Sequence, residues 1–243
     1  MQTIREHLLP LLKQQQEHYR HQLKHQLTDH NVQLLDYAQL NQAQCDWVDD
    51  YFQTSIFPVL TPLAVDPAHP FPFVSNLSLN VAAVVRDPET DQRQLARIKV
   101  PKKNLPRFVA IPSQLSNDNP EPIHTAIPVE QAIAFNLELL FPGMTMEGHY
   151  FYRVTRDADL ELRDLEADDL MLALEQGLRK RRMGGEVVRL EVANEMPDDV
   201  IDMLMTGLNV EEADLYKIDG PLGLDDLFGL TGLPISKLKS NVN

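Results

Sequence analysis

"NLSLNVAAVVRDPETDQRQLARIKV", residues 76–100, places two apolar stretches on either side of a polar segment. The first stretch, 76–86, alternates between apolar and polar residues and then becomes continuously apolar. The second, 94–100, carries Leu95, Ile98 and Val100. Alternation with a period of two, together with β-branched side chains, is typical of strands, and "DPETDQ" between them has the composition of a turn. The stretch therefore predicts a β-hairpin.

Strands and helices alternate irregularly after this hairpin. The segment 106–111 predicts a third strand, a loop is expected over 112–125, and a helix is expected from Pro128 to Leu140 because proline is favoured at the first helical position. Hairpins come early and β-α-β units come late, which predicts an α+β fold with a mixed, largely antiparallel sheet and flanking helices. The later expectations are strand, turn and strand over 149–164, a helix over 166–182, a strand over 186–192, a helix over 197–208 and a strand over 214–220.

An N-terminal helical segment precedes the sheet. Over 3–29 the apolar residues Tyr19, Leu23 and Leu27 recur every four positions, which predicts a helix with a narrow packing stripe. Pro10 is expected near the start of this helix, because an interior proline would kink it. A short extended piece is expected around Val32, Leu34 and Leu35.

A second helix is expected to begin after Asn41, an N-cap residue with Gln44 placed for a capping box. Pro58 should end it, because the residue before a proline is pushed out of the helical region. Both helices resemble the end of a helical bundle. The expected apolar face of the second helix consists of Trp47, Val48, Tyr51, Phe52 and Ile56.

The segment "PVLTPLAVDPAHPFPF", 58–73, combines five prolines with large apolar side chains. Proline holds the chain extended and reduces the entropy that is lost on ordering it. The pattern predicts a rigid connector that packs onto the fold without ladder hydrogen bonds.

Composition excludes several classes of protein. The chain of 243 residues has a net charge of −14, which argues against general nucleic-acid binding. Apolar runs are too short for a membrane span, and the N-terminus lacks the features of a signal peptide. The single cysteine, Cys45, excludes an internal disulfide and is expected to be a packing residue. We expect a cytoplasmic location, which includes one peripheral to a membrane.

Half of the 22 lysines and arginines lie in two short stretches, 92–107 and 179–189. One interpretation is ordinary decoration of strands and of a helix end, where cations suit the helix dipole. The other interpretation is a pair of anion-facing patches on an otherwise acidic protein. The strongest candidates are Lys102, Lys103, Arg179, Lys180, Arg181 and Arg182.

Three histidines are candidates for catalytic or metal-binding roles. His69 lies near Asp66, but turn hydrogen bonds within the proline-rich connector explain it more simply. His21 and His25 have the i, i+4 spacing of a helical metal pair, yet no further ligand or general-base glutamate is suitably placed. The sequence contains no glycine-rich phosphate loop, Ser-His-Asp set or carboxylate dyad that stands out. We therefore predict no catalytic residue and no metal site.

Five segments in order along the chain resemble bacterial polyphosphate kinase. They are "YFQTSIFPVLTPLAVDPAHPFPFVSNLSLNVAAVV" (51–85), "KVPKKNLPRFV" (99–109), "YFYRVTRDADLEL" (150–162), "LRKRRMGGEVVRLEV" (178–192) and "YKIDGPLGLDDL" (216–227). The resemblance implies an enzyme that makes inorganic polyphosphate from ATP through a phosphohistidine, with Mg²⁺ offsetting phosphate charge.

The resemblance also implies a domain organisation. Residues 1–57 correspond to the end of an N-terminal helical domain, 58–230 to the head or middle domain, and 231–243 to the start of a linker. In that family the phosphate-accepting histidine and the magnesium-binding groups lie in C-terminal domains that have no counterpart in this sequence. The chain alone is therefore expected to be inactive and to bind no cofactor, whereas the full-length enzyme uses ATP and Mg²⁺.

Partners implied by the resemblance are a second copy of the chain through the head domain, the remaining N- and C-terminal domains, and polyphosphate. The six basic candidates are then expected to border the path of polyphosphate or nucleotide phosphates. A non-catalytic, self-associating scaffold is the alternative, and polyphosphate binding would separate the two. A metal hydrolase that uses the helical histidines is a third alternative, which metal content would reveal.

Overall fold

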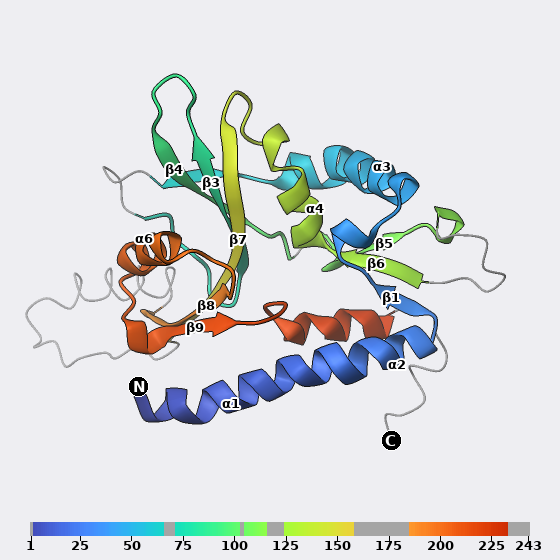
Figure 1. The fold of residues 1–243 in the computed structure, drawn as a ribbon, viewed down its shortest axis with the longest axis horizontal. Coiled ribbons are helices and arrows are strands. Elements are labelled where there is room, and N and C mark those ends of the chain that lie inside the picture. The colour runs from blue at the N-terminus through green and yellow to red at the C-terminus, as the bar shows by residue number, and fades with distance from the viewer. Residues whose placement is uncertain (1, 66–70, 103–104, 116–123, 158–184, 233–243) are drawn as a thin grey trace, which may run out of the picture.

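A computed structural model gives the fold, and its strands form two sheets (Figure 1). The six-stranded sheet has the order β2-β4-β3-β7-β8-β9, and the three-stranded sheet has the order β1-β6-β5. This confirms the α+β class with flanking helices and adds a second sheet. The structure describes residues 2–65, 71–102, 105–115, 124–157 and 185–232.

Several sequence predictions lie outside the described residues. These are the strand and helix expected between 158 and 182, the residues Asp66 and His69 of the connector, and five of the six basic candidates, Lys103, Arg179, Lys180, Arg181 and Arg182.

The predicted hairpin forms the centre of the larger sheet. β3 (Leu79–Arg86) pairs antiparallel with β4 (Arg93–Lys99), and on its other side with β7 (Thr145–Arg156). β7 then pairs antiparallel with β8 (Val187–Ala193), and β8 pairs parallel with β9 (Leu215–Ile218). The helix α6 (Asp198–Leu208) connects these two parallel strands, so the predicted late β-α-β unit is confirmed.

The smaller sheet contains one of the strands that the sequence did not predict. β6 (His124–Pro128) pairs parallel with β1 (Val32–Leu34) and antiparallel with β5 (Phe108–Ile111). It begins where a loop was expected and ends at Pro128, which is the N-cap of α4 (Val129–Phe135). A 3₁₀ turn, Leu137–Leu139, follows α4, so the helix expected from 128 to 140 is shorter than predicted.

The N-terminal segment is helical throughout, as predicted. α1 (Gln2–His18) continues through a π-helical turn into α2 (Lys24–Asp29). Pro10 lies well inside α1, which corrects its expected place near the start. Because Pro10 is exposed, water can bind the carbonyl group that loses its helical N–H donor.

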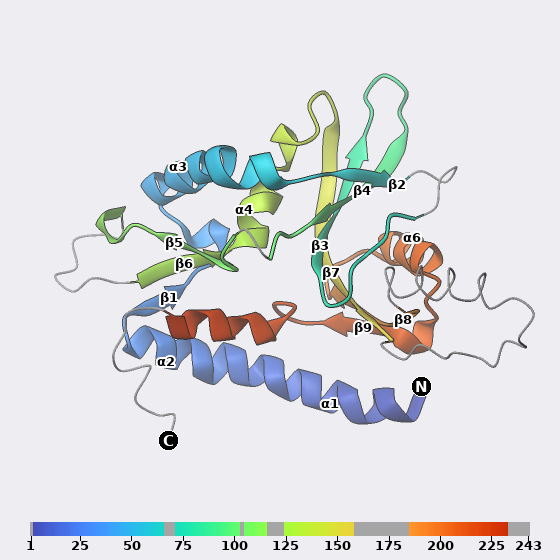
Figure 2. The same cartoon turned by 180° about the vertical axis from the view of Figure 1, so that it is seen from behind.

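A 3₁₀ helix near the other end of the chain, η9 (Leu224–Gly232), runs beside α1 and α2 in both views (Figures 1 and 2). Leu227 and Leu230 of η9 belong to the same apolar cluster as Leu23 and Leu27 of the N-terminal helical segment. No helix among the described residues is both long and apolar enough to cross a membrane.

The second predicted helix is α3 (Gln42–Tyr51), and its capping box is confirmed. The backbone N–H of Gln44 donates to Asn41 Oδ1 at 2.9 Å, and the N–H of Asn41 donates to Gln44 Oε1 at 3.0 Å. Helical turns continue to Val59, one residue beyond Pro58. Val48, Phe52 and Ile56 are fully buried, as expected for the apolar face.

Two apolar clusters meet the two faces of β3. Val81 and Ala83 pack into a cluster with residues of α3 and α4, while Ala82 and Val84 pack into a cluster with residues of α6. Because helices cover both faces, the strand is continuously apolar rather than alternating. This explains the run "VAAVV" at 81–85.

The connector makes one ladder that the sequence analysis did not expect. β2 (Leu63–Val65) pairs antiparallel with β4 at the edge of the larger sheet, with Leu63 opposite Arg97. Beyond 66–70, Phe71 packs against the cluster on the α6 side. The connector is therefore bound to the sheet by hydrogen bonds as well as by apolar contact.

Gly207 of α6 is the point where the helix meets the connector. A Cβ atom added there would lie 2.0 Å from Cδ2 of Phe71. We expect Gly207→Ala to lower the free energy of unfolding by about 1–3 kcal/mol through overpacking, measured by urea denaturation. In a Phe71→Ala background the same substitution should instead be neutral or stabilising by up to about 1 kcal/mol, since alanine favours helix. An equal effect in both backgrounds would contradict the close contact between Gly207 and Phe71.

Candidate functional site

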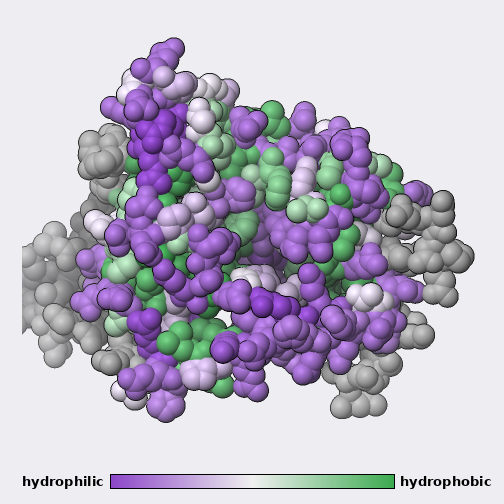
Figure 3. Space-filling view, viewed as in Figure 1, coloured by the Kyte–Doolittle hydropathy of each residue, from purple (hydrophilic) through white to green (hydrophobic). Residues whose placement is uncertain are grey.

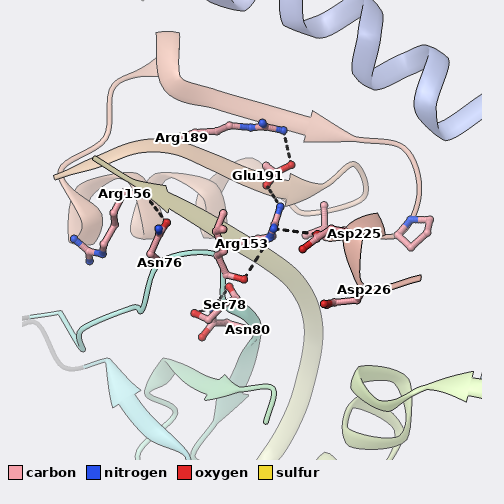
Figure 4. A network of polar contacts seen from close by, with 12 residues as sticks. Asn76, Ser78, Asn80, Arg153, Arg156, Arg189, Glu191, Asp225 and Asp226 are labelled. Carbon is pink, nitrogen blue, oxygen red and sulfur yellow. Dashed lines mark hydrogen bonds and ion pairs between the residues drawn. The ribbon is translucent and has the colours of Figure 1, made fainter. Parts of the chain in front are cut away.

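Eight charged side chains form one continuous chain of ion pairs that reaches from the larger sheet to α4. Each member lies within 4 Å of the next, and the signs alternate without exception. We call this set the ion-pair chain; its members in order are Arg189, Glu191, Arg153, Asp225, Lys102, Asp226, Arg107 and Glu130. Figure 4 shows the part around Arg153, Glu191 and Asp225.

The first three members lie on the adjacent strands β7 and β8. Arg153 and Glu191 are directly opposite each other in the ladder, and residues two apart on one strand share a face, so Arg189 lies beside Glu191. Arg153 Nη1 donates to Glu191 Oε2 at 3.2 Å, and Arg189 Nη2 donates to the other carboxylate oxygen. The Arg189 guanidinium also lies over the Tyr216 ring, 4.9 Å from its centroid. Only 6% of the Glu191 side chain is exposed.

Two adjacent acids at the start of η9 form the middle of the chain. Arg153 Nη2 donates to Asp225 Oδ1 at 3.1 Å, and Lys102 Nζ lies 2.7 Å from Asp226 Oδ1 and 3.9 Å from Asp225 Oδ2. Gly223 precedes them with φ of +68°, a conformation that glycine adopts without strain. The Lys102 and Asp225 side chains are 63% and 52% exposed, so this is the solvent-facing part of the chain.

The last two members are buried at the start of α4. Arg107 Nη2 donates to Glu130 Oε1 at 2.6 Å and to the carbonyl oxygen of Leu222 at 3.2 Å, while Nη1 lies 3.8 Å from Asp226 Oδ2. Burial raises the pKa of Glu130 to about 7, although the positive charge of Arg107 opposes the shift. Burial, with the negative charges of Asp36 and Glu130 adding to it, raises the pKa of the nearby Tyr19 to about 12.

A cavity of about 270 Å³ lies against the first half of the ion-pair chain. Leu12, Gln15 and Gln16 of α1 form one wall, and the opposite wall contains Arg153, Arg189, Glu191 and Asp225. Gln16 Nε2 donates to the carbonyl oxygen of Pro221 at 3.0 Å. The N-terminal helix thus covers a polar cavity on the sheet. Hydrophilic residues cover most of the face of the molecule shown in Figure 3.

Lys102 is the one basic candidate from the sequence that the structure describes. Its ammonium group lies between Asp225 and Asp226, so in this conformation it pairs with carboxylates of the same chain. The other five candidates lie outside the described residues, and their contact with phosphate stays a prediction.

Sequence reasoning missed most of the ion-pair chain. Arg107 and Arg189 lie within the two basic stretches, and Asp225 and Asp226 are adjacent acids, but the pairing between them joins distant parts of the sequence. The hydrogen bond between Arg107 and Leu222, for example, spans 115 positions. The pattern of charges along the sequence could therefore not have revealed the ion-pair chain.

The other candidates show no catalytic arrangement where the structure describes them. Across the described ranges, no group of three or more His, Cys, Asp or Glu side chains could hold a metal ion. Cys45 is half-buried on α3, and burial raises the pKa of its thiol, which disfavours the reactive thiolate. Asp66 and His69 lie outside the described residues.

Comparison with known proteins gives consistent matches. A family model described as the polyphosphate kinase middle domain matches residues 43–230. The polyphosphate kinase of Parasynechococcus marenigrum is 77% identical over 237 residues, which cover 98% of this chain and 33% of the relative. The polyphosphate kinase of Synechocystis is 48% identical over 241 residues, again covering 98% of this chain and 33% of the relative. The chain thus spans about a third of the length of these relatives.

A solved structure shares the fold. The crystal structure of polyphosphate kinase from Porphyromonas gingivalis matches with a TM-score of 0.77 over 97% of this chain and 32% of that chain. The sequence identity is 23%, so the match shows a common fold.

Two matched substitutions test whether buried members of the ion-pair chain contribute more to stability than exposed members. Arg107→Gln leaves Glu130 buried without its cation, so we expect a loss of about 3–5 kcal/mol in the free energy of unfolding. Lys102→Gln removes an exposed cation, and we expect a loss below about 1 kcal/mol. Denaturant unfolding measures both variants. Similar losses for the two variants would show that burial does not determine how much each ion pair contributes to the free energy of unfolding.

Proposed function

Because the chain belongs to the polyphosphate kinase family, we propose that it is the structural middle part of an ATP–polyphosphate phosphotransferase. The whole enzyme transfers the terminal phosphate of ATP to the end of a polyphosphate chain through a phosphohistidine, with Mg²⁺ offsetting phosphate charge. We assign none of that chemistry to this chain, because the resemblance places the phosphate-accepting histidine and the magnesium-binding groups in other parts of the enzyme.

The ion-pair chain is the observation that carries this proposal. It joins the larger sheet and the start of α4 to the first turn of η9, and apolar side chains hold η9 against the N-terminal helical segment. The chain spans about a third of its relatives, so further parts of the enzyme would need a rigid base from which to be positioned. A rigid base of this kind supports catalysis by holding reacting groups in a fixed geometry.

We also propose that the chain associates with a second copy of itself. Phe135 and Leu139, on and just after α4, are about half-exposed, and exposed apolar groups favour association. A scaffold that associates with itself without serving phosphate transfer is the alternative function. Sedimentation of the chain and of the whole enzyme measures their association. A strict monomer in both cases would contradict the proposed association.

The first test concerns activity. Incubated alone with radiolabelled ATP and Mg²⁺, the 243-residue chain should form neither acid-labile phosphohistidine nor polyphosphate. A chimera in which this chain replaces the matching third of the Parasynechococcus marenigrum relative should make polyphosphate. A folded chimera that makes none would contradict the proposed function, and labelling of the isolated chain would show that it holds a catalytic group.

The second test concerns the basic run. Four consecutive cations repel one another, and arginine binds phosphate oxygens through paired hydrogen bonds, so we propose that they border the path of polyphosphate. In the chimera, Arg181→Gln with Arg182→Gln should weaken polyphosphate binding about tenfold, with little change in Tm. The control is Lys217→Gln, which removes a cation that pairs with Asp198 on the surface. A fall in Tm with unchanged binding would assign the arginines to the fold.

A further inference from the structure

The cavity beneath α1 has an unusual balance of charge. Glu191 accepts hydrogen bonds from both Arg153 and Arg189, so these three members carry a net charge of +1. Asp225 cancels that charge by accepting a hydrogen bond from Arg153 Nη2. One half-exposed carboxylate thus neutralises a cavity that two arginines line.

Asp225 is the replaceable member of this group. Its side chain is 52% exposed, whereas that of Glu191 is 6% exposed, and it comes from the first turn of η9 rather than from the sheet. Exposed ion pairs contribute little to stability, so moving the Asp225 carboxylate away from Arg153 costs little. An anion of suitable shape can therefore compete with it.

The size of the cavity and its arginines indicate which anion suits it. A volume of about 270 Å³ suits a short phosphate chain, and Arg153 and Arg189 both line it. Arginine is well matched to phosphate oxygens through paired hydrogen bonds. Arg189 Nε has no hydrogen-bond partner among the described residues, so Glu191 does not engage the whole guanidinium group.

We propose that this cavity binds a terminal phosphate group, with Asp225 as an internal competitor that occupies the place of the anion when no phosphate is bound. The proposal rests on the proposed function for the view that phosphates are the relevant anions. Polyphosphate ends and nucleotide phosphates share this chemistry. The phosphate contacts that we propose for this cavity come from Arg153 and Arg189.

Binding of phosphate here would also loosen η9. Arg153 Nη2 holds the first turn of η9 through Asp225, while Lys102 and Arg107 hold it through Asp226. Once phosphate replaces Asp225, the amide groups of 224–227 should exchange hydrogen faster. Phosphate at this site would thereby weaken the contact between η9 and the larger sheet.

Calorimetry with the 243-residue chain at constant ionic strength tests the proposal, with sodium tripolyphosphate, ATP without Mg²⁺ and sodium sulfate as probes. Asp225→Asn removes the competitor and should bind tripolyphosphate about threefold more tightly than the unchanged chain. Arg189→Met should bind it about tenfold more weakly. Lys217→Met is the control, because Lys217 pairs with Asp198 of α6 and does not line the cavity; its affinity should not change.

Sulfate should bind at least about tenfold more weakly than tripolyphosphate, because it is smaller and carries less negative charge. Tighter binding of tripolyphosphate than of ATP would identify polyphosphate as the source of the group, and the reverse would identify the nucleotide; both outcomes support the site. Equal affinity of Asp225→Asn and the unchanged chain, or no binding by either, would overturn it, even if Arg189→Met does not fold. Polyphosphate synthesis by the chimera is a separate result, so failure here leaves the proposed function intact.

Discussion

The ion-pair chain that links the larger sheet, η9 and α4 depends on the pairing of buried charges. Glu130 and Glu191 are almost completely buried, and each is tolerable only because an arginine bonds directly to it. Arg153 lies on β7 and Arg107 lies just before β5, and both extend toward the same short helix. Asp225 and Asp226 of η9 pair with these same arginines, so ion pairs join η9 to them in addition to its apolar contacts.

Alternation of sign lets this requirement be met over a long distance. Each interior member has an opposite charge on both sides, so desolvation is offset along the whole chain rather than at one pair. The strength is uneven, because the ends are buried and the middle, at Lys102 and Asp225, faces solvent. The buried ends maintain the fold, whereas the exposed middle can change partners at small cost.

This division connects the fold to the proposed role in phosphate chemistry. Lys102 looks like a phosphate-binding residue in the sequence, yet in the structure two carboxylates of η9 surround its ammonium group. The arginines that line the polar cavity come instead from β7 and β8 of the larger sheet. A protein that handles polyanions must keep its cations from repelling one another when no substrate is bound, and internal acids serve that purpose.

The sequence by itself determined the local elements. Period-two apolar patterns identified the hairpin of β3 and β4, and the Asn41 and Gln44 pair identified the start of α3, because strands and caps depend on residues close in the chain. Tertiary structure alone decided that β5 joins a separate sheet with β1 and β6, and that Arg153 meets Glu191 and Asp225, 38 and 72 positions away. A charged residue in the sequence carries no mark of its partner, because an ion pair is selected by the spatial register that the packed core imposes.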